Sequence, residues 1–253
     1  MTTQHTQKDK PLMVITGASR RIGATLARFF SPHWQLALHA RQDNDDIQTL
    51  SRQLAQKGGI ALVFFADFRT TGERSTLIPN IIKRMGTAPQ CLINNASVFL
   101  KDSLRKEQPD HWHENILVNL HAPMQLIRSF HIHRPRHTPS CVINITDQRV
   151  LNPTPYFMSY TLSKSALHTL THTAALALAP HVRVNAIAPG PVMPDSTQTD
   201  EAFRRQCLAM PLQQGGDLKD ICHAAQFLTE ASSVTGQTIA VDGGQHLGYR
   251  HTS

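Results

Sequence analysis

The sequence predicts a single doubly wound α/β domain, in which helices cover both faces of a seven-stranded parallel sheet. Short apolar or β-branched runs alternate with longer amphipathic segments along the 253 residues, and this alternation is typical of parallel strands joined by crossover helices. A hydrophobic fraction of 40% and a charged fraction of 17% allow one large packed core. The chain has neither an internal repeat nor a low-complexity linker, so a second domain has no support.

Seven runs of strand length are separated by segments that are long enough to form helices. The expected strands are Leu12–Thr16, Gln35–His39, Ile60–Phe65, Cys91–Asn94, Cys141–Thr146, Val182–Ala188 and Thr238–Val241. The expected helices are Ile22–Ser31, Asp45–Lys57, Glu73–Met85, His111–Phe130, Pro155–Leu178 and Asp217–Glu230. We expect residues 1–10 to form a disordered polar tail and residues 11–253 to form the domain, with a substrate lid in the irregular segment around 190–216.

Charge and composition narrow the choice of partners. With 25 Lys and Arg against 18 Asp and Glu, the net charge of +7 favours anionic ligands. The basic residues are scattered, so no nucleic-acid partner is predicted. The absence of an export signal, of a membrane-length apolar run and of a Cys-x-x-Cys pair predicts a cytoplasmic protein that does not bind membranes. His168 and His172 share a helix face, but no third ligand is identifiable, so no metal is predicted.

The first chemical motif is the run TGASRRIG at residues 16–23, where the first strand ends and a helix begins. Gly17 permits a tight turn, and Gly23 permits a close approach of helix and strand. The free N–H groups at the start of the helix present positive charge to a pyrophosphate. The motif predicts a phosphate-binding turn of a Rossmann-type domain, although an ordinary strand-to-helix turn would have the same appearance if it stood alone.

The end of the second strand normally contacts the adenosine ribose of a dinucleotide, and here it carries His39 and Arg41 instead of a carboxylate. Arg41, together with Arg20 from the glycine turn, would neutralise a 2′-phosphate, which favours NADPH over NADH. Asp43 lies nearby and weakens this inference. Two arginines that are only solvated are the alternative.

A tyrosine and a lysine are spaced to share one face of a predicted helix. Tyr160 and Lys164 stand at positions i and i+4. A phenol is a poor proton donor at neutral pH, but an adjacent ammonium lowers its pKa by stabilising the phenolate. The pair is therefore predicted to transfer a proton, whereas an isolated Y-x-x-x-K is more often a surface pair.

Several motifs together resemble the short-chain dehydrogenase/reductase family in order and spacing over residues 11 to 248. They are the glycine turn, Asn94–Ser97, Asn119, Tyr160 with Lys164, Pro189-Gly190 and Val241–Gly244. The resemblance implies that Tyr160 is the catalytic acid and that Lys164 binds the nicotinamide ribose and lowers the tyrosine pKa. It also implies that Asn119 positions a water in a proton relay.

The same resemblance implies an NADPH site and a homotetramer built on the helices His111–Phe130 and Pro155–Leu178. Asp67 would contact adenine, and Asn95 would support the cofactor. The implied cofactor-binding residues are Gly17, Arg20, Arg21, Ile22, Gly23, His39, Arg41, Asp67, Asn95, Ala96, Ser97, Tyr160, Lys164, Pro189 and Gly190. Of these, Pro189 and Gly190 would border the nicotinamide.

Three departures from the general family pattern resemble the pteridine reductase branch, which includes dihydromonapterin reductases that also act on dihydrofolate. Arg21 replaces the middle glycine of the turn, Asp147 stands where a serine is usual, and Ser97 ends the N-N-A-S run. By this similarity, Arg21 would meet both a cofactor phosphate and the pterin, and Ser97 would bind cofactor and ligand. Phe99 would stack the pterin on the nicotinamide, and Asp147 would join Tyr160 in proton transfer.

The chemistry of Asp147 supports this interpretation without the resemblance. A ketone reductase needs a hydroxyl donor near the substrate oxygen, and an ionised carboxylate only accepts hydrogen bonds. The 2-amino-4-oxo ring of a pterin offers N–H donors to such a carboxylate, and burial could let Asp147 share a proton with Tyr160. The alternatives are an aspartate that caps a turn, a core Phe99 and a solvated Arg21.

The sequence therefore predicts an NADPH-dependent reductase that transfers hydride to a pterin, with dihydromonapterin or dihydrofolate, both 7,8-dihydropterins, as candidate substrates and the tetrahydro form as product. One alternative is a short-chain reductase of another carbonyl compound, such as a 3-oxoacyl thioester or a sugar. A second alternative is a cofactor-binding sensor without activity. The intact Tyr160, Lys164 and Asn119 speak against the sensor.

Overall fold

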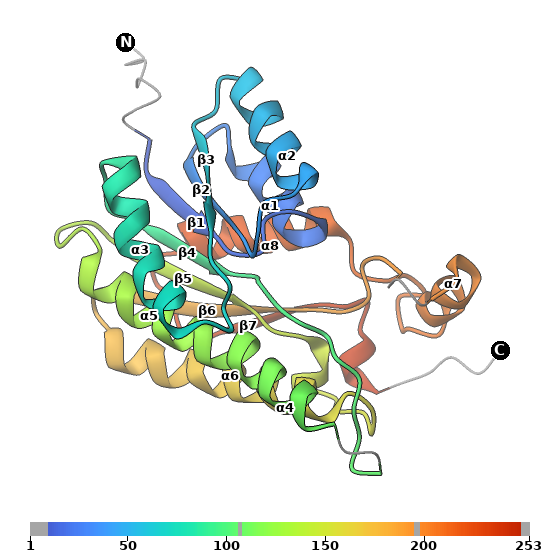
Figure 1. The fold of residues 1–253 in the computed structure, drawn as a ribbon. Helices are drawn as coiled ribbons and strands as arrows, with labels where there is room; N and C mark the ends of the chain where they lie inside the picture. The colour runs from blue at the N-terminus through green and yellow to red at the C-terminus, as the bar shows by residue number, and fades with distance from the viewer. Residues whose placement is uncertain (1–9, 106–107, 195–197, 249–253) are drawn as a thin grey trace.

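A computed structural model describes residues 10–105, 108–194 and 198–248. It contains one sheet of seven parallel strands in the order β3-β2-β1-β4-β5-β6-β7 (Figure 1). The strands are β1 (Leu12–Ile15), β2 (Gln35–Ala40), β3 (Ala61–Phe65), β4 (Cys91–Asn94), β5 (Ser140–Ile145), β6 (Val182–Pro189) and β7 (Thr238–Val241). The predicted doubly wound fold and its seven strands are confirmed, with strand ends that differ by at most one residue.

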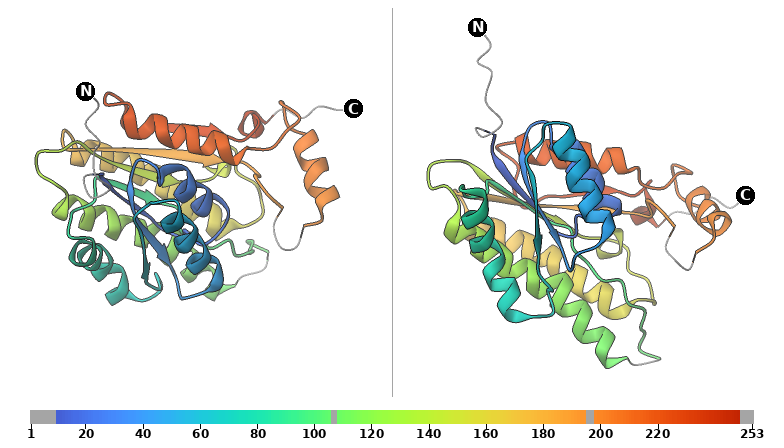
Figure 2. Two further views of the ribbon diagram at one scale, coloured as in Figure 1. Left: turned by 90° about the horizontal axis from the view of Figure 1, so that it is seen from above. Right: turned by 45° about the horizontal axis from the view of Figure 1, so that its top comes forward.

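The two faces of the sheet are buried in two separate apolar cores. Along β1, Met13 and Ile15 face one core while Leu12 and Val14 face the other, because successive strand residues point to opposite faces. The first core is covered by α1 (Arg21–Phe30), α2 (Asp45–Gln56) and α8 (Leu218–Glu230). The second is covered by α3 (Thr71–Met85), α5 (Ala122–His133) and α6 (Met158–Leu178). The two further views in Figure 2 show both helical layers on the sheet.

The single helix predicted over His111–Phe130 is wrong in its detail. The chain forms α4 (Pro109–Ile116), then one π-helical turn over Leu117–His121, and then α5. The wider turn contains Asn119, which is completely buried and makes hydrogen bonds to the loop after β4 and to α6. A local hydrophobic pattern contains no signal for this turn, because its partners are distant in sequence.

Helix α6 begins at Met158, three residues later than predicted. Phe157 has a left-handed backbone with φ of 57°, and its N–H donates to the Asp102 carbonyl at 3.1 Å. The Asp102 carboxylate accepts the Ser159 N–H at 3.0 Å and so caps the helix from the loop after β4. Asp102 therefore fixes the start of the helix that carries Tyr160, a role that the sequence analysis missed.

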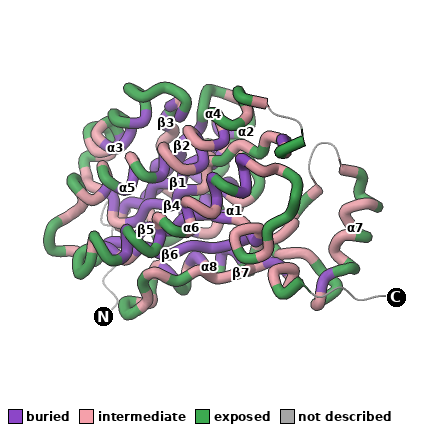
Figure 3. The backbone as a smooth tube through the Cα atoms, turned by 90° about the horizontal axis from the view of Figure 1, so that it is seen from below, coloured by how far each residue is buried: buried purple, intermediate pink, exposed green. Residues whose placement is uncertain are grey.

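The segment around 190–216 contains a helix that was not predicted. Helix α7 (Asp200–Leu208) is capped by Thr199, whose side chain accepts the Ala202 N–H at 3.2 Å. None of its residues is buried, and Figure 3 shows it as an exposed and half-buried tube beside the sheet. A lid function for the segment stays a prediction.

The predicted disordered tail falls almost entirely on residues 1–9, outside the described residues. Within the three described ranges, no helix is both long enough and apolar enough to cross a membrane.

Candidate active site

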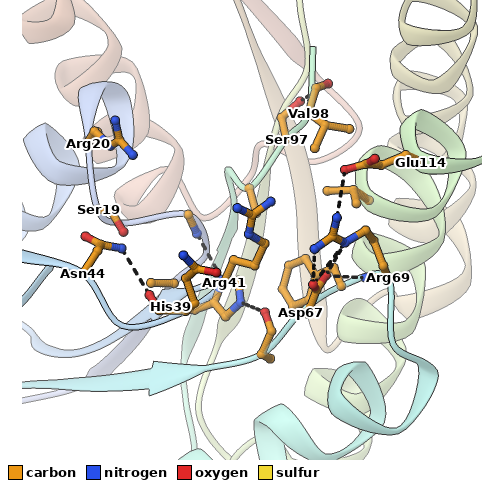
Figure 4. Close-up of a pocket in the computed structure, with 17 residues that line it drawn as sticks. Ser19, Arg20, His39, Arg41, Asn44, Asp67, Arg69, Ser97, Val98 and Glu114 are labelled. Carbon is orange, nitrogen blue, oxygen red and sulfur yellow. Dashed lines mark hydrogen bonds and ion pairs between the residues drawn. The ribbon is translucent and has the colours of Figure 1, made fainter. Parts of the chain in front are cut away.

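Two adjoining pockets lie at the carboxyl ends of the strands, the position where doubly wound sheets bind ligands. The first pocket, of about 340 Å³, is lined by the ends of β1, β2 and β3 (Figure 4). The second pocket, of about 430 Å³, continues past the ends of β5 and β6 to Tyr160 and Lys164. Both pockets share Gly17, Arg20, Ala96 and Ser97, so they form one elongated site.

The glycine turn is compressed against the end of β4. Gly17 has φ of 63°, and a Cβ placed on it would lie 2.8 Å from the Ala96 Cα. A Cβ on Gly23 would lie 2.3 Å from the Gly17 carbonyl oxygen and 2.7 Å from the Asn95 Nδ2. Asn95 fixes the turn, because its side-chain amide donates to the carbonyls of Thr16 and Gly17 at 2.9 Å each. This cradle lacks side chains where a diphosphate would approach the backbone, and it therefore fits a dinucleotide.

His39 is a structural part of the same turn. Its Nδ1 accepts the Gly17 N–H at 3.2 Å, while its Nε2 lies 2.9 Å from the Ala66 carbonyl. Since a carbonyl only accepts, Nε2 carries the proton and the ring is neutral. Burial lowers the pKa of His39 to about 4. His39 lines the first pocket, as expected of a cofactor-binding residue, and it also supports the backbone of the turn.

Two predicted arginines line the first pocket. Arg41 and Arg20 both line it, and Arg20 pairs with Asp46 at 2.9 Å. The Asp67 carboxylate lines the same pocket and is held by Arg69, whose Nε lies 2.9 Å and 3.0 Å from its two oxygens, while its contact with adenine stays a prediction. This hydrogen bond from Arg69 lowers the pKa of Asp67. The sequence analysis missed Arg69, which follows Asp67 by two positions.

The side chain of Asn119 is held by hydrogen bonds within the protein, and its positioning of a water stays a prediction. Its Oδ1 accepts the Ser97 hydroxyl at 3.0 Å and the Val98 N–H at 2.9 Å. Its Nδ2 donates to the Val98 carbonyl at 3.0 Å and to the Ser163 Oγ at 3.1 Å. The amide is therefore fully used inside the protein, and it ties the loop that carries Ser97 to helix α6.

Tyr160 and Asp147 meet directly in the second pocket. The phenol donates a hydrogen bond of 2.8 Å to the Asp147 Oδ2. The other carboxylate oxygen accepts the Arg149 N–H at 2.9 Å, so Asp147 also caps the short turn that follows β5. Asp147 therefore contacts Tyr160 and caps the turn at the same time, and its role in proton transfer stays a prediction.

The predicted lowering of the Tyr160 pKa by Lys164 is wrong for this structure. Burial raises the pKa of Tyr160 well above its usual value, and the neighbouring Asp147 carboxylate raises it further. The Lys164 ammonium lies 5.8 Å from the centre of the phenol ring and donates to the Ile145 carbonyl at 2.8 Å. Burial also lowers the pKa of Lys164, to about 8.

Phe99 stands at the mouth of the second pocket and remains 41% exposed. One face of its ring stacks on Phe157 with centroids 4.1 Å apart, and it meets the Tyr160 ring edge-on at 4.6 Å. The Arg149 guanidinium lies 5.3 Å from the Phe99 centroid. The sequence analysis missed Phe157 and Arg149, although they lie three residues before Tyr160 and two after Asp147.

The remaining predicted residues complete the walls of the second pocket. Arg21 has a left-handed backbone with φ of 51° and donates to the Met193 carbonyl at 3.3 Å. Ile22, Pro189 and Gly190 also line this pocket. A Cβ on Gly190 would lie 2.7 Å from the Asp242 Cα, so this position is closed to larger residues.

The histidine pair on α6 does not build a metal site within the part of the chain that the structure describes. His168 and His172 are in edge-on contact at 4.6 Å, and the His168 Nδ1 is 3.1 Å from the Thr238 hydroxyl. No group of three His, Cys, Asp or Glu side chains suited to a metal ion occurs among the described residues.

The glycine cradle and the Tyr160–Lys164 pair define a dinucleotide-dependent oxidoreductase site, and comparison with known proteins places the chain in a family. The family model described as enoyl-(acyl carrier protein) reductase matches residues 17–246. The chain belongs to this family, which is part of the short-chain dehydrogenases/reductases. It is also 27% identical to the 3-oxoacyl-[acyl-carrier-protein] reductase FabG of Staphylococcus epidermidis, over 92% of this chain and 98% of that protein.

Two solved structures are more similar. FolM alternative dihydrofolate reductase 1 from Brucella suis, crystallised with NADP, is 37% identical with a TM-score of 0.91, over 97% of this chain and 98% of that one. The corresponding protein from Brucella canis, also crystallised with NADP, is 36% identical with a TM-score of 0.88 and covers 96% of both chains. Both comparisons agree with the single seven-stranded domain described above.

Gly23→Ala tests the compressed turn, and Gly72→Ala serves as the matched control. Alanine at 23 would collide with backbone atoms, whereas a Cβ at Gly72 meets nothing within 4 Å. We expect Gly23→Ala to lower the free energy of unfolding by about 1–3 kcal/mol and to weaken NADPH binding. Gly72→Ala should leave binding unchanged and stability equal or higher. Urea unfolding and fluorescence titration measure both effects, and equal behaviour of the two variants would contradict the close-approach argument.

His39 should make the free energy of unfolding depend on pH. The folded-state pKa of about 4 lies below the ordinary histidine pKa of 6.5, so the unfolded chain takes up a proton first as pH falls. The contribution of His39 to the free energy of unfolding is complete above about pH 6.5. It is lost as the pH falls towards 4, which lowers the free energy of unfolding by up to about 3 kcal/mol. Urea unfolding from pH 7 to 4.5 should show a steeper loss in the wild type than in His39→Gln. Parallel curves would show that His39 is not held neutral by the fold.

Proposed function

We propose that this protein is an NADPH-dependent reductase of a reduced pterin, which converts a 7,8-dihydropterin such as dihydromonapterin or dihydrofolate to the tetrahydro form. The main support is the direct hydrogen bond of 2.8 Å between the Tyr160 phenol and the Asp147 carboxylate. A carboxylate at this position accepts hydrogen bonds and cannot donate one to a ketone oxygen. The similarity to two FolM alternative dihydrofolate reductases supports the same proposal.

The proposed cofactor fits the residues of the elongated site. The cradle around Gly17 and Gly23 would hold the diphosphate, and the first pocket beside Arg41 would hold the adenosine half with its 2′-phosphate. Lys164, on α6 and hydrogen-bonded to the Ile145 carbonyl at the end of β5, would hold the nicotinamide ribose. When bound, NADPH would supply the hydride for the carbon of the substrate C=N bond.

The residues of the chain would supply the proton and the orientation. A pterin offers N–H groups that can donate to Asp147 in place of the Tyr160 phenol. The phenol would then turn its hydrogen to the nitrogen of the C=N bond and protonate it as the carbon receives hydride. Phe99, braced on its other side by Phe157, would provide the flat surface for the ring. A simple ketone has no N–H group with which to displace Tyr160 from the carboxylate.

Reduction of a 3-oxoacyl thioester is the second candidate. The similarity to FabG over 92% of the chain favours it. Asp147 disfavours it, because the hydroxyl donor that such a carbonyl needs is replaced by an acceptor.

We also propose that the chain forms a homotetramer through the outer surfaces of α5 and α6. Met124 and Ile132 on α5 and Leu162 and Leu176 on α6 are large apolar side chains that are exposed in the single chain. Burial of such side chains against copies of the chain would be favourable.

The direct test is the oxidation of NADPH, followed by absorbance, with a panel of substrates at equal concentration. We expect turnover with dihydromonapterin or dihydrofolate and little turnover with 3-oxoacyl thioesters, sugars or simple ketones. Turnover confined to the ketones would overturn the pterin proposal and leave the short-chain reductase class. Tight NADPH binding without any turnover would favour a sensor.

Asp147→Ser restores the residue type that is usual in the family. We expect it to lower kcat for the dihydropterin by about 100-fold, since the acceptor for the substrate N–H is lost, and to leave the Kd for NADPH within about twofold. Steady-state kinetics and NADPH fluorescence measure the two quantities. Asp147→Asn, which keeps the shape, is the control for folding. Unchanged turnover in Asp147→Ser would remove the carboxylate from the mechanism.

A further inference from the structure

We propose that Arg149 is a positioning residue of the reductase, which acts through Asp147 and thereby determines the protonation of Tyr160. The kinetic test of this role rests on the proposed reductase function, whereas the contacts that support the role do not. The geometry that carries it is a chain of three side chains in the second pocket, Arg149, Asp147 and Tyr160, in which the carboxylate stands between a cation and a phenol.

Arg149 contacts Asp147 in two ways. Its backbone N–H donates to the carboxylate at 2.9 Å, and its Nη1 lies 3.3 Å and 3.4 Å from the two carboxylate oxygens. Both side chains are largely enclosed, with 21% and 16% of their surfaces exposed. In such a setting a carboxylate is disfavoured unless a cation compensates it, so the pair is more than a screened surface contact.

Aromatic rings hold the guanidinium in place. It lies 5.3 Å from the centroid of Phe99 and 5.5 Å from that of Phe157, and these two rings are stacked on each other. The arginine cannot leave the carboxylate without also losing both cation–π contacts. The same rings form the surface on which the substrate is proposed to lie, so the position of Asp147 is coupled to the aromatic wall of the pocket.

The charges around the phenol assign the role. Four charged groups surround the Tyr160 phenol. Asp147 and Arg149 belong to the turn after β5 and Arg21 to the start of α1, whereas Lys164 is on the same helix as Tyr160. Burial and Asp147 raise the pKa of Tyr160, and Arg149 and Arg21 lower it. Arg149 binds the Asp147 carboxylate through its backbone N–H and its Nη1, and the phenol donates to the same carboxylate, so Arg149 holds the acceptor that orients the Tyr160 hydroxyl.

The test is a double-mutant cycle between Arg149 and Asp147. Arg149→Met keeps the length of the side chain and removes its charge and its hydrogen bonds. We expect it to lower kcat about tenfold in the wild-type background but less than about twofold in the Asp147→Asn background, with an unchanged Kd for NADPH. Arg149→Lys, which keeps the charge, should recover part of the loss. Arg84→Met, which removes another arginine from an aromatic ring 5.0 Å away, should have no effect.

Equal losses in both backgrounds would overturn the proposal, since Arg149 would then act on the substrate directly. Full activity of Arg149→Met would overturn it as well.

A second readout does not need turnover. Difluorotyrosine at position 160 has a more acidic phenol than tyrosine, and its ionisation can be followed by ¹⁹F NMR in the ligand-free protein. We expect Arg149→Met to raise the pKa of this phenol, because a nearby cation is removed, and Arg84→Met to leave it unchanged. An unmoved phenol pKa would overturn the positioning role. If the pKa moves but no pterin is reduced, the positioning role stands and the proposed function fails. If a pterin is reduced but Arg149→Met lowers kcat equally in both backgrounds, the proposed function stands and the positioning role fails.

Discussion

The active site depends on how closely the first strand-to-helix turn approaches the end of β4. Gly17 and Gly23 have no room for a Cβ, and the atoms that exclude it belong to Ala96, Asn95 and the turn itself. Asn95 and His39 then fix the turn from two neighbouring strands, through the Gly17 carbonyl and the Gly17 N–H. Because the two side chains bind backbone groups of the turn, the N–H groups at the start of α1 have a fixed direction before any ligand arrives. Preorganisation of this kind lets a helix N-terminus bind a diphosphate without a further entropic cost.

A second constraint acts on the opposite side of the site. Asn119 in the π-helical turn and Asp102 in the loop after β4 both bind groups on α6, at Ser163 and at the Ser159 N–H. Tyr160 lies between these anchoring points, and Lys164 directly follows the second of them on the same helix. A buried polar network in which every member is satisfied restricts the rotation and sliding of a helix more strongly than apolar packing does. The catalytic helix is therefore positioned by amide and carboxylate groups that have no direct access to a ligand.

Periodicity and turn chemistry were sufficient to predict the fold class and all seven strands, because parallel strands buried on both faces have a strong local signature. The roles that depend on partners distant in sequence were not predictable. The π-helical turn at Asn119, the cap formed by Asp102 and the contact of Arg149 with Phe99 and Phe157 are of this kind. The error on the Tyr160 pKa has the same origin, since helical spacing identifies Lys164 as a neighbour but gives no information about the depth of burial or the carboxylate opposite.

The exchange of a hydroxyl for a carboxylate changes what such a site can reduce. With a hydroxyl at position 147, the substrate oxygen would find two donors, one from that residue and one from Tyr160. With Asp147, the phenol donates to an acceptor, and under the proposed function a substrate would bring its own donor to release it. A flat ring with N–H groups beside its C=N bond meets this requirement, and Phe99 offers it a surface that is still 41% exposed. Selectivity of this kind arises from a mismatch with simple carbonyls as much as from attraction to the proposed substrate, because a ketone would leave the carboxylate and the phenol paired with each other.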